Sequence, residues 1–263
     1  MSTASLMVDS SGAVGGITSA DLKLLPDPVR TRTHHPVAFH VLDDMMQHRL
    51  RKEFGVAVEV LPQFALNRTM TQIFGVYALR YPNESGLLPA MAFRSSIDKS
   101  LQPKIAGGGR VWVCTNTCVW GDLLEVMRKQ TKDSMEEIET MIIKVCAKLE
   151  SHFHSAELEV EVMQDMEVND RRGYAVLGEL FGTGVLTPNQ MTRAFRTWKK
   201  PGIEDFKPRS AWSLYNSVTE GLKVGQPGHM MGRYMRLHQD FRQRYVNAFG
   251  ESVVPSLSQR LDS

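Results

Sequence analysis

The pattern of apolar and polar residues predicts one helix followed by strands in the first half of the chain, and mainly helices in the second half. Between residues 41 and 54 apolar side chains recur at steps of three and four, which predicts a helix that ends at Gly55. Short runs rich in β-branched and aromatic residues follow, separated by turn sequences such as PNESG. These runs predict strands at 56–60, 71–81, 87–94 and 110–114. Because their connections are short, the strands are expected to be antiparallel.

Helical periods dominate the second half. Ser134 and Glu137 match the S-x-x-E capping sequence, and the apolar face after them predicts one long helix into the low 160s. Further helices are expected at 169–181, 187–198, 210–223 and 233–249. The order of elements predicts an α+β fold: an antiparallel sheet with a β-β-β-α-like core, backed by the long helix and followed by a C-terminal helical region.

Composition adds a domain organisation. Residues 1–28 are rich in Ser, Thr, Ala and Gly and are expected to form a flexible lead-in. We expect an α+β core domain over 29–165, a helical region over 166–250 packed on it, and a tail over 251–263. The net charge of the 263 residues is only +2, so a partner must be inferred from local clusters of charge.

Cysteine usage and hydropathy bear on the compartment. The three cysteines, Cys114, Cys118 and Cys146, have no spacing typical of a disulfide framework, which favours a reducing environment. No apolar run reaches transmembrane length, and the N-terminus lacks the features of a secretory signal. We therefore expect a cytoplasmic protein that has no membrane partner.

The stretch 87–121 holds the side chains that best indicate a function. Its strand–loop–strand unit contains four cations: Arg94, Lys99, Lys104 and Arg110. Several cations on one face bind the phosphates of a nucleic acid, and nearby aromatic rings stack on unpaired bases. A second cluster in the helical half surrounds Phe195 and Trp198 and contains Arg193, Lys199 and Lys200. Ordinary solvated charge around buried aromatic residues explains both clusters equally well.

Other chemistries have weaker support. The glycines at 107–109 lead into a strand without a following Gly-Lys-Ser/Thr, so we expect a flexible connection and no nucleotide-binding loop. The cysteines and histidines lack metal-ligand spacing. Asp98 and Ser96 are expected to order their loop by binding backbone groups. A metal-dependent enzyme centred on Asp98 is an alternative, but no partner base is visible. We assign no catalytic residue, metal ligand or cofactor.

Three segments resemble a family of phage- and plasmid-associated proteins of unknown function. They are FRSSIDKSL at 93–101, GGGRVWVCTNTCVWGD at 107–122 and WSLYNSVTEG at 212–221. In that family a loop of the type N-S-H-D-G/K-S precedes a strand of the type R-F-V-C-x-N-G, and a W-x-x-Y-N-x-V-T-E segment follows. Ile97 stands where the family often has His, so a metal or general-base role for that His could not operate here.

The order of strands and long helix also resembles, as a fold, the Rad52-like single-strand annealing proteins. That resemblance implies rings or filaments that hold DNA in a basic groove, although fold alone does not fix function. We therefore expect a homo-oligomeric protein of phage or plasmid type that binds DNA, with single strands favoured. It would assist annealing, recombination or replication in a bacterial cell or phage-infected host. The alternative is a non-enzymatic protein-interaction or host-defence-modulating factor that docks through its helical half.

Overall fold

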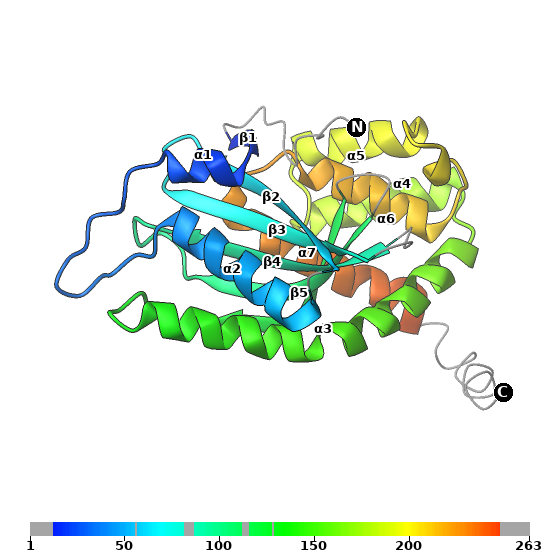
Figure 1. Cartoon of the computed structure of the whole chain (residues 1–263). Helices are drawn as coiled ribbons and strands as arrows, with labels where there is room; N and C mark the ends of the chain where they lie inside the picture. Colours follow the sequence, from blue (N-terminus) through cyan, green and yellow to red (C-terminus); the bar gives the residue numbers. More distant parts are fainter. Residues whose placement is uncertain (1–12, 56, 82–86, 112–115, 128, 248–263) are drawn as a thin grey trace.

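An antiparallel sheet lies at the centre of the molecule (Figure 1). The computed structural model describes residues 13–55, 57–81, 87–111, 116–127 and 129–247. Each strand pairs with the next along the chain, in the order β1 (Ala13–Ile17), β2 (Glu59–Asn67), β3 (Gln72–Arg80), β4 (Leu87–Ser96), β5 (Lys104–Val111) and β6 (Thr117–Val126). The predicted α+β fold with an antiparallel sheet is confirmed.

Helices cover both faces of this sheet. The first half contributes α1 (Ser19–Lys23) and α2 (Phe39–Phe54), followed after the sheet by α3 (Ser134–Asp165). The second half contributes α4 (Asp170–Gly182), α5 (Pro188–Lys199), α6 (Ala211–Leu222) and α7 (Pro227–Phe241), with a 3-10 turn at Glu204–Phe206 and a π-helical turn at Arg242–Asn247. Figure 1 shows α2 and α3 in front of the sheet and α7 behind it. Within the described ranges no helix is both long and apolar enough to cross a membrane.

The strands are apolar on both faces because each face packs against helices. On β4, Met91 and Phe93 belong to the core beneath α2 and α3, whereas Ala90 and Ala92 belong to the core beneath the C-terminal helices. Such nearly continuous apolar runs are expected for strands covered on both sides. The sheet therefore joins the two halves of the chain, and its ends are left for the connecting loops.

The strand boundaries differ from the sequence-based predictions. The strand expected at 56–60 begins at Glu59 and continues to Asn67, and β1 and β6 were not predicted. The strand expected at 110–114 begins at Lys104, so the predicted flexible connection at 107–109 is wrong. A Cβ atom on Gly107 would lie 2.4 Å from Leu123 Cδ1, so this glycine permits close packing. Residues 112–114 lie outside the described ranges.

The helical half follows its predictions more closely, with two differences. Asp133 is the N-cap residue of α3, and Ser134 is its first helical residue, so the predicted capping box is wrong. The last helix starts at Pro227, six residues before the predicted Arg233, because a proline at the first helical position was not recognised. Within the expected flexible lead-in, residues 13–23 form β1 and α1. The predicted tail at 251–263 lies outside the described residues.

Candidate nucleic-acid interface

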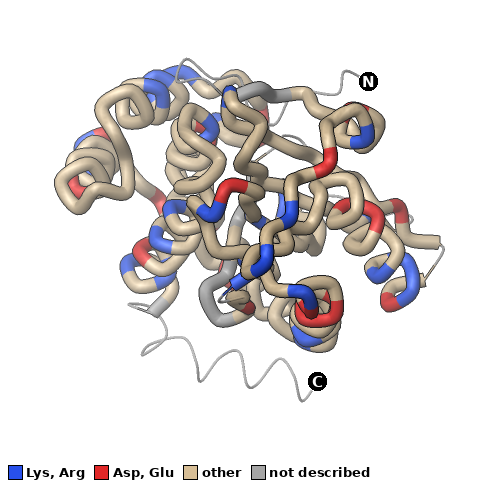
Figure 2. Tube along the Cα trace, turned by 90° about the vertical axis from the view of Figure 1, so that its left-hand side faces the viewer, with Lys and Arg blue, Asp and Glu red and all other residues tan. Residues whose placement is uncertain are grey.

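Loops from four parts of the chain meet at one end of the sheet. We call this region the loop end and define it as residues 30–35, 67–72, 94–104, 127 and 129–133. The backbone N–H of Ile97 donates to Thr71 O at 2.9 Å, and that of Met127 donates to Pro103 O at 3.0 Å. Figure 2 faces this end and shows Lys and Arg positions across its middle.

Short-range hydrogen bonds order the connection between β4 and β5. Asp98 Oδ1 accepts from the backbone N–H of Ser100 at 3.0 Å and also from its hydroxyl. Ser96 Oγ accepts from the backbone N–H of Leu101 at 2.9 Å. Burial alone would raise the pKa of Asp98, but the hydrogen bonds from Ser100, Thr71 and Ser96 outweigh it and lower that pKa. Asp98 therefore stabilises the loop as a carboxylate.

Gln130 forms hydrogen bonds that connect three of the four loop-end segments. Its Nε2 donates to Ser96 O at 2.6 Å, and its Oε1 accepts from the backbone N–H of Val37 at 3.0 Å. Its carbonyl accepts from the backbone N–H of His35 at 3.0 Å. The side chain is buried, at 4% exposure. The sequence does not indicate this residue, because a single glutamine in a polar connection belongs to no recognisable pattern.

The structure brings three of the four predicted loop cations together. Arg94 and Lys104 face each other across β4 and β5, and Lys99 lies exposed in the loop between them, with a φ of 67°. Burial and the neighbouring Arg94 lower the pKa of Lys104, and burial lowers that of Arg94. Arg94 Nη1 donates to Gly228 O, at the start of α7, at 2.5 Å. Arg110 lies apart, at the opposite end of β5.

Charges at the loop end are unbalanced. Its described cations are Arg30, Arg32, Arg68, Arg94, Lys99, Lys104, Lys129 and Lys132. Its acids are Asp98 and Asp133. Among the described residues none of these cations forms an ion pair, whereas Arg49, Arg193 and Arg244 elsewhere each meet a carboxylate. The loop end is therefore a positive region although the whole chain is nearly neutral.

The second predicted cluster lies on α5. Arg193 Nη2 pairs with Glu220 Oε1 at 2.5 Å, whereas Lys199 and Lys200 are exposed at the C-terminal end of the helix. Trp198 is buried, but Phe195 is 37% exposed, and its ring lies 5.1 Å from that of Tyr174. Tyr174 was not predicted, because it belongs to α4 and meets α5 only in the folded chain.

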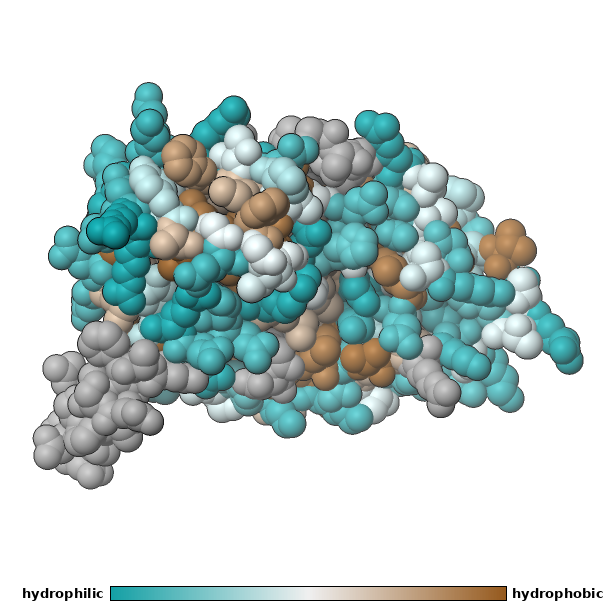
Figure 3. All heavy atoms as spheres, turned by 180° about the vertical axis from the view of Figure 1, so that it is seen from behind, coloured by the Kyte–Doolittle hydropathy of each residue, from teal (hydrophilic) through white to brown (hydrophobic). Residues whose placement is uncertain are grey.

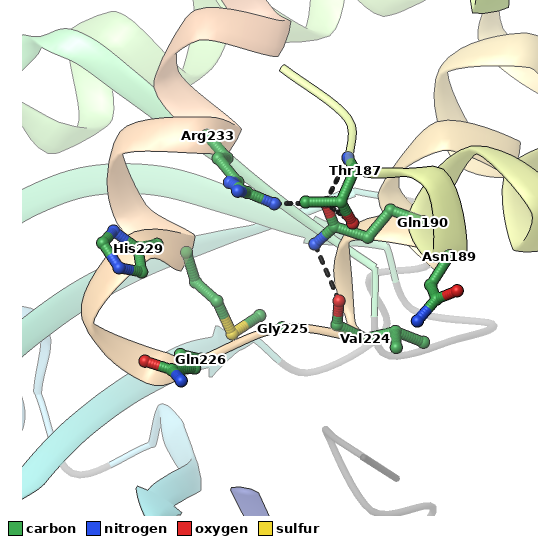
Figure 4. A pocket seen from close by; sticks show the side chains of 9 residues that line it. Thr187, Asn189, Gln190, Val224, Gly225, Gln226, His229 and Arg233 are labelled. Carbon is green, nitrogen blue, oxygen red and sulfur yellow. Dashed lines mark hydrogen bonds between the residues drawn. The ribbon is translucent and has the colours of Figure 1, made fainter. Parts of the chain in front are cut away.

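Two cavities lie between the loop end and this cluster. The first, of about 280 Å³, is lined by the starts of α5 and α7 and by the turn between α6 and α7 (Figure 4). The second, of about 500 Å³, is lined by Arg193 and Arg196 and shares Asn189 and Val224 with the first. Arg94 donates to Gly228 O, and Gly228 precedes the lining residue His229, so Arg94 lies next to the first cavity.

Side chains for other chemistry are not gathered in the part of the chain that the structure describes. No group of three or more His, Cys, Asp or Glu residues is placed there so that it could hold a metal ion. Burial raises the pKa of the Cys146 thiol to about 12, so this cysteine is not a reactive thiolate. Cys114 lies outside the described residues. Asp98 is surrounded by hydroxyl and backbone donors, which suits a structural carboxylate.

No family model, curated protein or solved structure matches this chain. The resemblances to phage- and plasmid-associated proteins and to annealing proteins therefore stay predictions. What the chain does must be inferred from the geometry and charge described above.

Proposed function

We propose that the chain binds single-stranded DNA at the loop end and so assists annealing, recombination or replication, as a protein of phage or plasmid type. The observation that supports this function is the set of loop-end cations that have no carboxylate partner among the described residues. Phosphates would supply the missing negative charge, and the counterions that they release on binding would favour the complex. Affinity should therefore fall steeply with salt.

Two features of the surface favour single strands over duplexes: cations on separate loops and partly exposed aromatic rings. Lys99, Arg68 and Lys129 are exposed on three separate loops, which suits a flexible backbone that can bend between them. The partly exposed pair of Phe195 and Tyr174 offers rings on which unpaired bases can stack. A strand that followed the cations from the loop end to α5 would meet phosphate-binding and base-stacking groups in turn.

Fluorescence anisotropy with a labelled oligothymidylate tests this function. We expect binding at low salt that the double variant Lys99→Gln/Lys104→Gln weakens about tenfold, with the slope of log Kd against log salt reduced by about 0.7 for each lost contact. The matched control is Lys144→Gln/Lys207→Gln, which removes two exposed lysines that already pair with acids. Absence of binding at low salt, or equal weakening by the control, would refute a loop-end site.

We also propose that the chain acts as a homo-oligomer, in a ring or filament. β1 and β6 are the edges of the sheet, and edge strands can pair with another chain. Light scattering after size exclusion, with and without oligonucleotide, measures the assembly. A monomer under both conditions would contradict this part.

A protein-docking role is the second candidate, and exposed apolar side chains on the helical half favour it. Tyr174, Phe181 and Phe195 are each at least one third exposed on α4 and α5. Figure 3, a view from behind, shows a group of hydrophobic residues at the upper left and others at the lower middle and right edge. This function would be favoured if oligonucleotides failed to bind at low salt and a co-purifying host protein were lost with Phe181→Ser and retained with Lys99→Gln/Lys104→Gln.

A further inference from the structure

A cavity of about 280 Å³, lined by both polar and apolar side chains, lies where α5 and α7 begin. Its polar lining residues are Thr187, Asn189, Gln190, Gln226, His229 and Arg233. Figure 4 shows Arg233 reaching from α7 toward Gln190 and Thr187 of α5, while His229 and Gln226 lie on the same side as Arg233, nearer the start of α7. At about 30 Å³ for each water of the bulk liquid, the cavity has room for a phosphate group with several waters.

The cavity is positively charged. None of its lining residues is acidic. Arg233 Nη1 donates to the neutral Oε1 of Gln190, whose amide is held by Thr187 and by Val224 O at 2.7 Å. Burial and the neighbouring Arg236 lower the pKa of Arg233, so its charge is destabilised there. By contrast, Arg193 in the adjoining cavity is neutralised by Glu220.

The helices that border the cavity add to its positive potential. Both are long enough to have a macrodipole, with 12 residues in α5 and 15 in α7. Thr187 and Gln226 are their N-cap residues, so the positive ends of both helices lie at the cavity. Together with the Arg233 guanidinium and the His229 ring, this makes the cavity suited to an oxyanion.

We propose that this cavity binds one phosphate group, contacted by Arg233 and His229. Gly228, next to His229 in the chain, accepts a hydrogen bond from Arg94, so the cavity adjoins the loop end. A phosphate of a bound DNA strand is therefore the expected ligand. This assignment rests on the proposed binding of DNA. Free phosphate has the same chemistry and would occupy the cavity without DNA.

Inorganic phosphate tests the cavity alone. We expect the melting temperature of the wild-type chain to rise in millimolar phosphate relative to chloride of equal ionic strength. Arg233→Gln should abolish this rise, whereas Arg171→Gln, which removes an exposed arginine of α4 that lines neither cavity, should retain it. Loss of the rise in both variants, or its persistence in Arg233→Gln, would overturn the assignment.

Asn189→Asp separates binding from folding. It adds a carboxylate to the cavity at the second residue of α5, where the helix dipole favours a negative charge. We expect unchanged or higher stability without phosphate, together with loss of the phosphate effect. Gln239→Glu adds the same charge at an exposed position of α7 outside both cavities and should leave the effect intact. An intact effect in Asn189→Asp would refute the cavity as the site.

Oligonucleotide binding distinguishes the two sources of phosphate. If a DNA phosphate occupies the cavity, Arg233→Gln should lower the salt slope of oligothymidylate binding by about 0.7, and Arg171→Gln should not. Phosphate binding without any DNA binding would support the cavity and refute the proposed function. DNA binding with an unchanged slope, and no response to inorganic phosphate, would refute the cavity and leave the proposed function standing.

Discussion

Gln130 shows how much one side chain determines the geometry of the loop end. Replacement by alanine would leave the buried Ser96 carbonyl and the Val37 N–H without their partners. Each unsatisfied buried group costs about 1–3 kcal/mol, so we expect Gln130→Ala to lower the free energy of unfolding by about 2 kcal/mol or more. Urea denaturation measures the loss. Gln239→Ala, at an exposed glutamine, should change stability by no more than about 0.5 kcal/mol.

The same residue marks a limit of prediction at this scale. The sequence predicted the cluster of Arg94, Lys99 and Lys104 because these residues are close along the chain, and the structure places them together. It could not predict Gln130, whose partners lie 34 and 93 residues away. Nor could it separate Arg193, which has a carboxylate partner, from Lys199, which has none among the described residues.

A buried tyrosine makes stability depend on alkaline pH. Tyr77 donates from its hydroxyl to Asp43 Oδ1 at 2.9 Å, and burial, followed by the Asp43 charge, raises its pKa well above the usual value. The unfolded chain therefore loses this proton first, near pH ~10, while the folded chain keeps it. The contribution of Tyr77 to the free energy of unfolding is therefore fully present below that pH. Above it, the contribution falls by up to about 1.4 kcal/mol per pH unit.

Tyr77→Phe tests this dependence. We expect the unfolding free energy of the variant to fall less steeply above pH ~10 than that of the wild type. At neutral pH it should be about 1–3 kcal/mol less stable, since Asp43 loses a hydrogen-bond donor in the core. Tyr174→Phe, at a partly exposed tyrosine, should leave the pH dependence unchanged. A wild-type curve that stayed flat between pH 10 and 11 would contradict the expectation.

Among the elements, β5 owes its contacts with α3 and β6 to the absence of a side chain. A Cβ atom on Gly107 would meet Leu123 at 2.4 Å and Leu149 at 3.2 Å. Overpacking of this kind costs about 1–3 kcal/mol, so Gly107→Ala should destabilise the protein by that amount. Gly232→Ala should do the opposite, because the added Cβ meets nothing within 4 Å and alanine favours a helix by about 0.5–1 kcal/mol. Thermal unfolding of both variants measures the contrast.

The sequence predicted an element correctly where its apolar periodicity is bounded by a residue that caps or ends a helix. Helix α2 ends at Phe54 and has Gly55, with a φ of 88°, as its C-cap, and α5 begins at Pro188 with Thr187 as its N-cap. Prediction failed in β5, where glycines that normally interrupt a strand are required by close packing. It also failed in β1, which is short and gains its structure by pairing with β2. Packing across the sheet decides such cases, and local sequence does not contain it.

At the scale of the molecule, charge is segregated although the net charge is only +2. The sequence contains nearly equal numbers of basic and acidic residues, so composition argues for no partner. Acidic residues neutralise cations on the helices, as Glu159 does for Arg242 and Glu179 does for Arg244, and few acids lie at the loop end. Only the fold decides which cations are neutralised, so the loop-end surface could not be predicted from composition.

The two halves of the chain share one sheet, and this makes the helical half necessary for the fold of the first. The face beneath the C-terminal helices carries Phe74, Val76, Ala90 and Ala92, all of them buried. A chain truncated after Asp165 would expose this face to water, and large exposed apolar surfaces associate. We expect that truncated chain to bind a hydrophobic dye and to aggregate, whereas the full chain should do neither. A monomeric truncated chain with cooperative unfolding would instead show that residues up to 165 form an independent domain.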